Sequence, residues 1–132
     1  MILVDTSVWI DFLKGTGSAE RRKLHELIED EQDVSIAGLI LTEILQGITA
    51  NDQFFKTRDY FMEFPIFEPK VAATYVSAAF TYGECRKKGK TVRSTVDCVI
   101  AAICLENDLT ILHKDRDYNI IEECAGLKVL RA

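Results

Sequence analysis

Short apolar runs alternate with amphipathic helical segments along the whole chain, and this alternation most limits the possible fold. Runs of this length suit buried strands, and strands separated by helices pair in parallel because the helix supplies the crossover. We therefore expect an α/β fold, a three-layer α/β/α sandwich with a parallel sheet of about five strands. The expected strands are residues 1–4, 34–37, 64–67, 109–113 and 127–130, and the expected helices are 8–14, 19–31, 39–48, 53–62, 69–88, 94–107 and 119–124.

Local signals predict the ends of several helices. Thr6 or Ser7 can cap the first helix, and Gly15 can end it. Pro69 suits the first position of the longest helix. Apolar residues recur in that helix at helical spacing and predict its buried face. This face consists of Ala72, Tyr75, Val76, Ala79 and Phe80.

The length of 132 residues suits a single domain, and no linker or repeat divides residues 1–132. The longest apolar run, Cys98–Leu105, has eight residues, whereas a membrane helix needs about 20. No basic segment precedes the first apolar run, so we expect neither a membrane span nor a signal peptide. The four cysteines form no Cys-x-x-Cys pair, which favours reduced thiols and a cytoplasmic location.

The charge balance at first argues against a nucleic-acid partner. The chain has 16 basic and 21 acidic residues, a net charge of −5, whereas phosphate contacts depend on Lys and Arg. One basic stretch, residues 86–93, nevertheless contains no acid and leads directly to Ser94. It could guide a phosphate backbone, or it could be a solvated helix end whose cations complement the helix dipole. Its bases are Arg86, Lys87, Lys88, Lys90 and Arg93.

Several common catalytic arrangements are missing from the sequence. It has no glycine-rich phosphate loop and no Gly-x-Ser-x-Gly turn. The two histidines, His25 and His113, are too few for a histidine-rich metal site and offer little to a catalytic triad. The acidic residues are therefore the best candidates for catalysis.

Acids follow the predicted strands at the edge where ligands bind in parallel sheets. Asp5 ends the first strand, and Asp115 and Asp117 follow the fourth. Glu43 lies early in the helix after the second strand, and Asp97 lies in the first turn of the helix that leads into the fourth. Both helices begin at the carboxyl edge of the sheet. We expect these carboxylates to converge although they are far apart in sequence.

Converging carboxylates repel one another unless a cation lies between them. Hard oxygen ligands favour Mg²⁺, with Mn²⁺ as a substitute. A cation held in this way can activate a water and stabilise the leaving oxygen of a phosphodiester. The acid set therefore predicts metal-assisted phosphodiester hydrolysis.

Each acid also has a purely structural interpretation. Asp5 could simply cap the next helix, and Glu43 could be a solvated helix residue. Ser94 and Asp97 fit a capping box, and acids such as Asp115 are ordinary in loops. The joint arrangement is less ordinary than any single member, and we therefore favour the metal site.

Four segments together resemble the motifs of PIN-domain ribonucleases, most closely the VapC toxins of toxin–antitoxin pairs. They are MILVDTSVW at residues 1–9, TEILQG at 42–47, RSTVDCVIAA at 93–102 and HKDRDY at 113–118. Each motif is weak alone, but the ordered set spans essentially the whole chain. The resemblance implies a parallel sheet between helices and RNA cleavage that depends on Mg²⁺ or Mn²⁺.

The resemblance also implies roles for individual residues. The family's acidic residues fall on Asp5, Glu43, Asp97 and Asp115, while Asp117 matches a further acid of many members and Thr6 or Ser7 matches a polar residue after the first acid. The family further implies a homodimer and a VapB-like antitoxin, which lays a hydrophobic segment over the toxin and inserts a basic residue into the acidic site. By analogy, Trp9, Phe12 and Leu13 would line the antitoxin groove, although a lone Trp is more often core.

Two other functions remain open at this point. The chain could be a PIN nuclease outside toxin–antitoxin systems, or a non-catalytic signalling module similar to a response-regulator receiver. A receiver needs a paired acid at the first strand and a phosphoacceptor Asp after the third. Here Thr6 follows Asp5, and Glu68 and Pro69 follow the third predicted strand, so the sequence favours the toxin ribonuclease.

Overall fold

The computed structural model describes residues 1–132 and is built around one parallel sheet. Its strands are β1 (Ile2–Val4), β2 (Val34–Ala37), β3 (Ile66–Phe67) and β4 (Thr110–Leu112). They lie in the order β3-β2-β1-β4, and every neighbouring pair is parallel. The carboxyl ends of β1 and β4 therefore lie next to each other at one edge, where the acids were expected.

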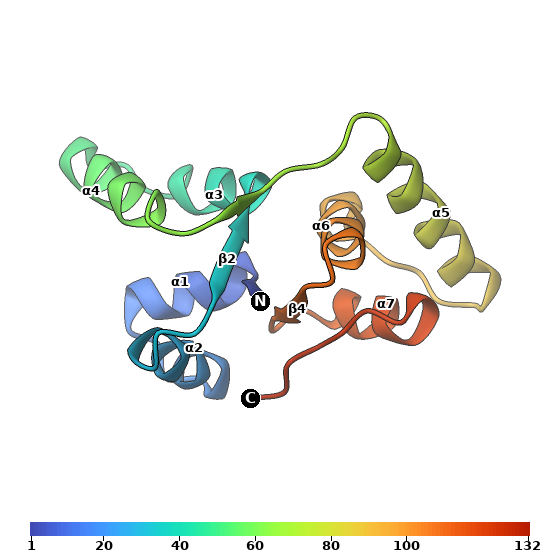
Figure 1. Cartoon of the computed structure of the whole chain (residues 1–132), viewed down its shortest axis with the longest axis horizontal. Helices are drawn as coiled ribbons and strands as arrows, with labels where there is room; N and C mark the ends of the chain where they lie inside the picture. Colours follow the sequence, from blue (N-terminus) through green and yellow to red (C-terminus); the bar gives the residue numbers. More distant parts are fainter.

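Seven helices surround the sheet. They are α1 (Thr6–Lys14), α2 (Ala19–Glu29), α3 (Gly38–Leu45), α4 (Asn51–Phe61), α5 (Ala73–Lys87), α6 (Thr95–Glu106) and α7 (Arg116–Ala125). The first four lie on one side of the sheet and the last three on the other (Figure 1). The predicted α/β/α sandwich is confirmed.

The sheet has four strands, and the fifth predicted strand is reduced to a single bridge. Val129 bridges Ile111 in parallel, and the backbone amides of Ile111 and Leu130 form the two flanking hydrogen bonds. Gly126 ends α7 in the left-handed conformation with φ 72°, just as Gly15 ends α1 with φ 73°. Leu127 then enters the core, so the chain runs beside β4 for one pair only.

Helix caps explain where the predicted boundaries were wrong. α1 begins at Thr6, because Asp5 itself is the cap and accepts a hydrogen bond from the Ser7 amide. α7 begins at Arg116, earlier than expected, because the Asp115 side chain accepts from the Asp117 amide. Gly15 ends α1 as predicted.

The longest helix begins later than predicted and turns the opposite face inward. The Lys70 amide donates to Thr74 Oγ1, and α5 starts only at Ala73 instead of Pro69. All five residues of the predicted buried face are exposed, with Phe80 68% and Val76 66% accessible. The buried face is a row of small side chains at Thr74, Ala78, Thr81 and Cys85.

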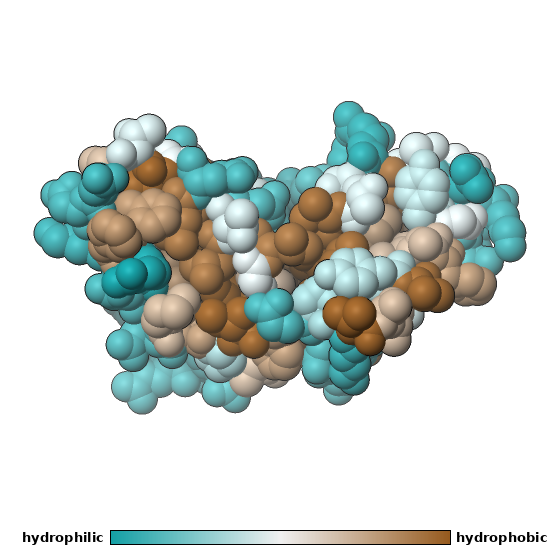
Figure 2. Space-filling model, turned by 90° about the horizontal axis from the view of Figure 1, so that it is seen from above, coloured by the Kyte–Doolittle hydropathy of each residue, from teal (hydrophilic) through white to brown (hydrophobic).

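Small side chains on α5 allow close packing against α6, which is buried along Asp97–Cys104. The bulky face of α5 consequently remains outside. Hydrophobic side chains also reach the surface over the middle of the molecule when it is seen from above (Figure 2). The prediction of a buried face failed because helical spacing identifies a stripe but not the partner that covers it.

All four cysteines are free, and three of them are buried. Burial raises the pKa of the Cys104 thiol to about 12, which keeps it protonated and unreactive. None of the helices combines the length and apolar character needed to cross a membrane.

Candidate active site

Three helices begin at the carboxyl edge of the sheet and bring their first residues together there. Asp5 caps α1 directly after β1, and Asp115 caps α7 after β4. Asp97 lies in the first turn of α6, where Ser94 Oγ accepts from its amide. Helix N-termini carry partial positive charge, which helps the fold tolerate several acids in one place.

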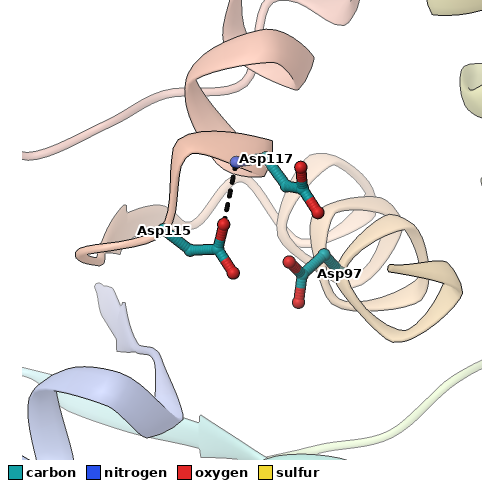
Figure 3. A group of neighbouring side chains, drawn as sticks. All are labelled: Asp97, Asp115 and Asp117. Carbon is teal, nitrogen blue, oxygen red and sulfur yellow. Dashed lines mark hydrogen bonds between the residues drawn. The ribbon is translucent and has the colours of Figure 1, made fainter. Parts of the chain in front are cut away.

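The acids Asp97, Asp115 and Asp117 form a compact group at this edge (Figure 3). One carboxylate oxygen of each lies within 4.8 Å of the others. Asp97 and Asp117 are buried, and Asp115 is half-buried. Oxygens at this spacing fit the coordination of a hard divalent cation.

Two oxygens of this group lack a hydrogen-bond partner. Asp97 Oδ2 and Asp117 Oδ1 are buried and accept no hydrogen bond. The other oxygen of Asp117, Oδ2, accepts from the amides of Arg93 and Ser94, each at 3.2 Å. Buried carboxylate oxygens are normally partnered, so the donor set fits a cation between α6 and α7.

Asp5 joins this group through a residue that the sequence alone did not single out. The buried Tyr118 hydroxyl lies 3.0 Å from Asp5 Oδ1 and 3.2 Å from Asp97 Oδ1. Asp5 Oδ2 accepts from Ser7 Oγ at 2.9 Å. Burial, with the charges of Asp5 and Asp97, raises the pKa of Tyr118 well above its ordinary value, so the hydroxyl stays protonated.

The electrostatics of the cluster are unfavourable without a cation. Burial, followed by the charges of Asp5 and Asp115, raises the pKa of Asp97 to about 8. Such a shift arises where carboxylates are held together in a poorly solvated place. The fold therefore tolerates electrostatic repulsion between carboxylates at the site where acids far apart in sequence meet.

Glu43 lies beside the cluster but outside the compact group of three. Thr6 Oγ1 donates to Glu43 Oε1 at 2.7 Å and links the start of α1 to α3. Glu43 also lines a cavity of about 340 Å³ with Ile10, Leu13 and Ile44. It thus connects the acidic edge to an apolar groove between α1, α3 and α4.

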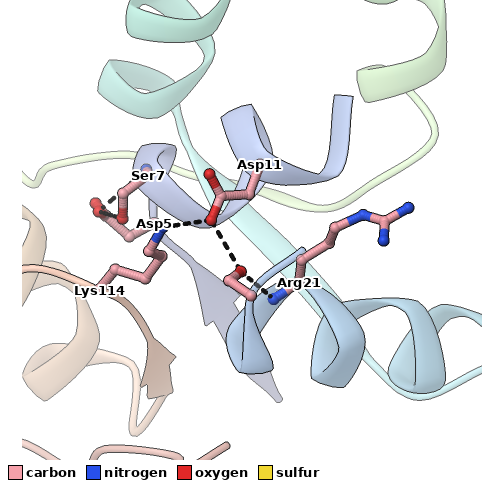
Figure 4. A network of polar contacts seen from close by, with 6 residues as sticks. Asp5, Ser7, Asp11, Arg21 and Lys114 are labelled. Carbon is pink, nitrogen blue, oxygen red and sulfur yellow. Dashed lines mark hydrogen bonds and ion pairs between the residues drawn. The ribbon is translucent and has the colours of Figure 1, made fainter. Parts of the chain in front are cut away.

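A second polar network braces the loop after β4 (Figure 4). Lys114 forms an ion pair and hydrogen bond with Asp11 of α1, and Ser18 Oγ donates to the same Asp11 oxygen at 2.9 Å. The Lys114 contact lowers the pKa of Asp11. His113 Nδ1 accepts from the Asp115 amide at 3.1 Å. The sequence did not predict these contacts, because only the fold places α1 beside the β4–α7 loop.

The basic stretch lies on the exposed end of α5 and the segment that leads to α6. Lys87 pairs with Glu84 at 3.2 Å, and Lys90 pairs with Glu123 at 3.6 Å. Lys88 donates to the Cys124 carbonyl at 3.4 Å. Arg86 stacks over Tyr82, and Arg93 is exposed beside its amide contact with Asp117.

The three residues suggested for antitoxin contact differ in accessibility. Trp9 is fully buried among Phe12, Phe61 and Phe64, and it is not among the residues that line the groove. Phe12 is half-buried, and Leu13 is exposed at the groove. The core interpretation of Trp9 fits its burial.

Comparison with known proteins agrees with this geometry. The PIN domain family model matches residues 2–123. Ribonuclease VapC11 of Mycobacterium tuberculosis is 30% identical over 129 residues, which cover 97% of this chain and 96% of the relative. The chain therefore belongs to the PIN-domain family. Within that family it belongs with the VapC ribonucleases.

Solved structures show the same fold. FitAcB from Neisseria gonorrhoeae matches with a TM-score of 0.71 and 21% identity, covering 99% of this chain and 97% of that one. A toxin–antitoxin complex from Klebsiella pneumoniae matches with a TM-score of 0.66 and 19% identity, covering 99% and 97%. Membership in the PIN-domain family excludes the receiver-like alternative.

Proposed function

We propose that this protein is a metal-dependent endoribonuclease and the toxin of a VapBC-type toxin–antitoxin pair. The observation that carries the proposal is the group of Asp97, Asp115 and Asp117, in which two buried oxygens have no partner. Its relatives are named as VapC ribonucleases, which makes RNA the expected substrate. A cytoplasmic location is part of the proposal, because RNA and free thiols both suit that compartment.

The acids of the cluster would hold Mg²⁺, or Mn²⁺ as a substitute. Asp97, Asp115 and Asp117 supply the oxygens, and Asp5 faces the same place through Tyr118. A bound divalent cation lowers the pKa of a coordinated water and stabilises charge on a phosphodiester. The hydroxyls of Thr6 and Ser7 donate to Glu43 and Asp5 respectively, which restrains both carboxylates at the acidic edge.

We expect Asp97→Asn to reduce Mg²⁺-dependent RNA cleavage by at least ~100-fold, because a cation ligand and its charge are lost together. Cleavage of a labelled single-stranded RNA, followed over time with Mg²⁺ and with excess EDTA, measures this effect. Asp5→Ala should behave similarly. Circular dichroism should show both variants folded.

Asp59→Asn is the matched control, because it removes an exposed carboxylate from α4, far along the chain from the cluster. It should cleave RNA at the wild-type rate. Full activity of Asp97→Asn, or undiminished wild-type activity in EDTA, would refute the metal-dependent mechanism.

The apolar groove between α1, α3 and α4 is the proposed antitoxin site. Ile10, Leu13, Ile44 and Ile48 offer an apolar lining, and Glu43 lies in the same cavity beside the acidic edge. A hydrophobic segment that lies in this groove could place a basic side chain against Glu43. That arrangement matches what the VapC resemblance implies for a VapB-like antitoxin.

The exposed face of α5 is the proposed homodimer contact. Tyr75, Val76, Ala79 and Phe80 are all accessible, and Leu105 of α6 lines the same depression as Val76 and Phe80. A contiguous apolar surface of this kind is unusual on a monomer. A second copy of the chain would cover it in the dimer that the family resemblance implies.

A further inference from the structure

The Tyr118 hydroxyl occupies a central place among the acids. The whole side chain is buried, and its oxygen lies between Asp5 Oδ1 and Asp97 Oδ1, at 3.0 and 3.2 Å. These two carboxylates come from distant parts of the sequence, since Asp5 caps α1 directly after β1 and Asp97 lies in the first turn of α6. One hydroxyl thus links two acids that nothing else in the structure connects directly.

The position of this hydroxyl is well fixed. Tyr118 lies in the first turn of α7, and its amide donates to the Asp115 carbonyl at 3.2 Å. Its ring packs beside His113, with the ring centroids 5.0 Å apart. A buried aromatic ring held by its own helix start and a neighbour has little freedom to move. Asp115, Asp117 and Tyr118 therefore enter the site as one rigid unit.

The hydrogen bonds decide which carboxylate oxygens remain available. Tyr118 occupies Oδ1 of Asp97, and the oxygen left without a partner is Asp97 Oδ2. Asp5 has Tyr118 at Oδ1 and Ser7 at Oδ2. A phenol carries a single hydrogen and donates it to one carboxylate at a time, so the Tyr118 hydroxyl can donate to either Asp5 Oδ1 or Asp97 Oδ1 while it stays within hydrogen-bond distance of both.

We propose that Tyr118 is a positioning residue that fixes Asp5 and Asp97 for cation binding. This inference rests on the proposed metal-dependent function, and it assigns to Tyr118 a role through the ligands and not on the RNA itself. Groups that orient metal ligands typically change metal affinity on the order of 10- to 100-fold when they are removed.

The test is Tyr118→Phe, which removes one oxygen and keeps the buried ring. Calorimetric titration with Mn²⁺ should show an affinity about tenfold weaker than that of the wild type. RNA cleavage at low Mn²⁺ should fall by a similar factor. Saturating Mn²⁺ should restore the rate to within about threefold of wild type, because the hydroxyl acts on ligand position and not on the reacting atoms.

Tyr60→Phe is the control, because it removes a phenol oxygen from α4 and leaves the acid cluster untouched. Its Mn²⁺ affinity should equal that of the wild type. Unfolding of each variant in EDTA separates a loss of stability from a loss of metal affinity, since a purely structural role would change only the former.

Equal Mn²⁺ affinity in Tyr118→Phe and wild type would overturn the inference while leaving the proposed function intact. A rate that stays low at saturating Mn²⁺ would also overturn it, because the hydroxyl would then act on the reaction directly. Wild-type protein that neither binds Mn²⁺ nor cleaves RNA would refute the proposed function, and this inference with it.

Discussion

At the scale of single residues, the acids serve as caps and as candidate ligands at once. Asp5 and Asp115 cap α1 and α7, as a structural interpretation would have it, yet they also lie at the edge where Asp97 arrives. The two interpretations therefore do not exclude each other. A cap needs one oxygen to accept an amide, and the second oxygen remains free for another partner.

Sequence order was sufficient to predict that the acids converge, because carboxyl ends of parallel strands share an edge. Sequence order was not sufficient to predict which of these acids lie closest together. Asp117 belongs to the compact group of three, whereas Glu43 lies outside it. Tyr118 was missed because the direction of a side chain in a first helical turn depends on the packing of that turn.

The raised pKa of Asp97 predicts how the stability of the metal-free protein depends on pH. Its pKa is about 8 in the fold, against an ordinary value of 3.8, so the folded protein binds an extra proton between these values. The free energy of unfolding should therefore fall as pH rises through this window, by up to ~1.4 kcal/mol per pH unit. Urea unfolding in EDTA across the window measures this slope.

Asp97→Asn provides the comparison for that slope, because an amide does not titrate. Its stability in EDTA should be nearly independent of pH in the window and should exceed that of wild type at the upper end. Mg²⁺ should stabilise wild type there, since a ligand that binds only the fold raises its stability. A wild-type free energy of unfolding that does not change with pH in EDTA would contradict the raised pKa assigned to Asp97.

At the scale of helices and strands, alternation and caps predicted the order of the elements, but not every buried face. α5 carries a bulky stripe and a small stripe on opposite sides, and both have helical spacing. The small stripe is buried because α6 packs closely there with Ala101 and Ala102 in its own buried stretch. Sequence periodicity cannot distinguish a core face from an interface face, since both exclude water.

The exposed stripe makes a prediction about assembly. Phe80→Glu should weaken the proposed homodimer by at least ~2 kcal/mol, about 30-fold in dissociation constant, because a charge would replace a buried aromatic anchor. Sedimentation over a range of protein concentrations measures the constant. The fold should persist, since Phe80 is 68% exposed in the single chain.

Phe55→Glu is the matched control for assembly, because Phe55 is also exposed, at 48%, but lies on α4 on the other side of the sheet. It should dimerise like the wild type. Equal dimerisation of all three proteins, or a wild type that is monomeric at every concentration, would show that another partner covers the α5 face.

At the scale of the whole molecule, the net charge of −5 hides a separation of charge. The acids gather at the carboxyl edge of the sheet, and the basic stretch runs from the end of α5 toward that edge. Arg93 reaches it directly, because its amide bonds to Asp117. A bound divalent cation would offset part of the acidic charge, so the total does not argue against an RNA substrate.

This arrangement predicts that Arg86 and Arg93 contact the RNA backbone. Neither arginine is in an ion pair, in contrast to Lys87 and Lys90. In an Asp97→Asn background, which prevents cleavage, we expect R86Q with R93Q to bind single-stranded RNA more weakly. The slope of log affinity against log salt should become shallower by about 1.4, since each lost phosphate contact removes about 0.7. Fluorescence anisotropy across a salt series measures both the affinity and this slope.

The control is K23Q with K128Q, which makes the same change in net charge on α2 and near the C-terminus, away from the basic stretch. This pair should leave the slope unchanged. If both pairs lowered the affinity equally, the effect would come from total charge, and the basic stretch would be only a solvated helix end.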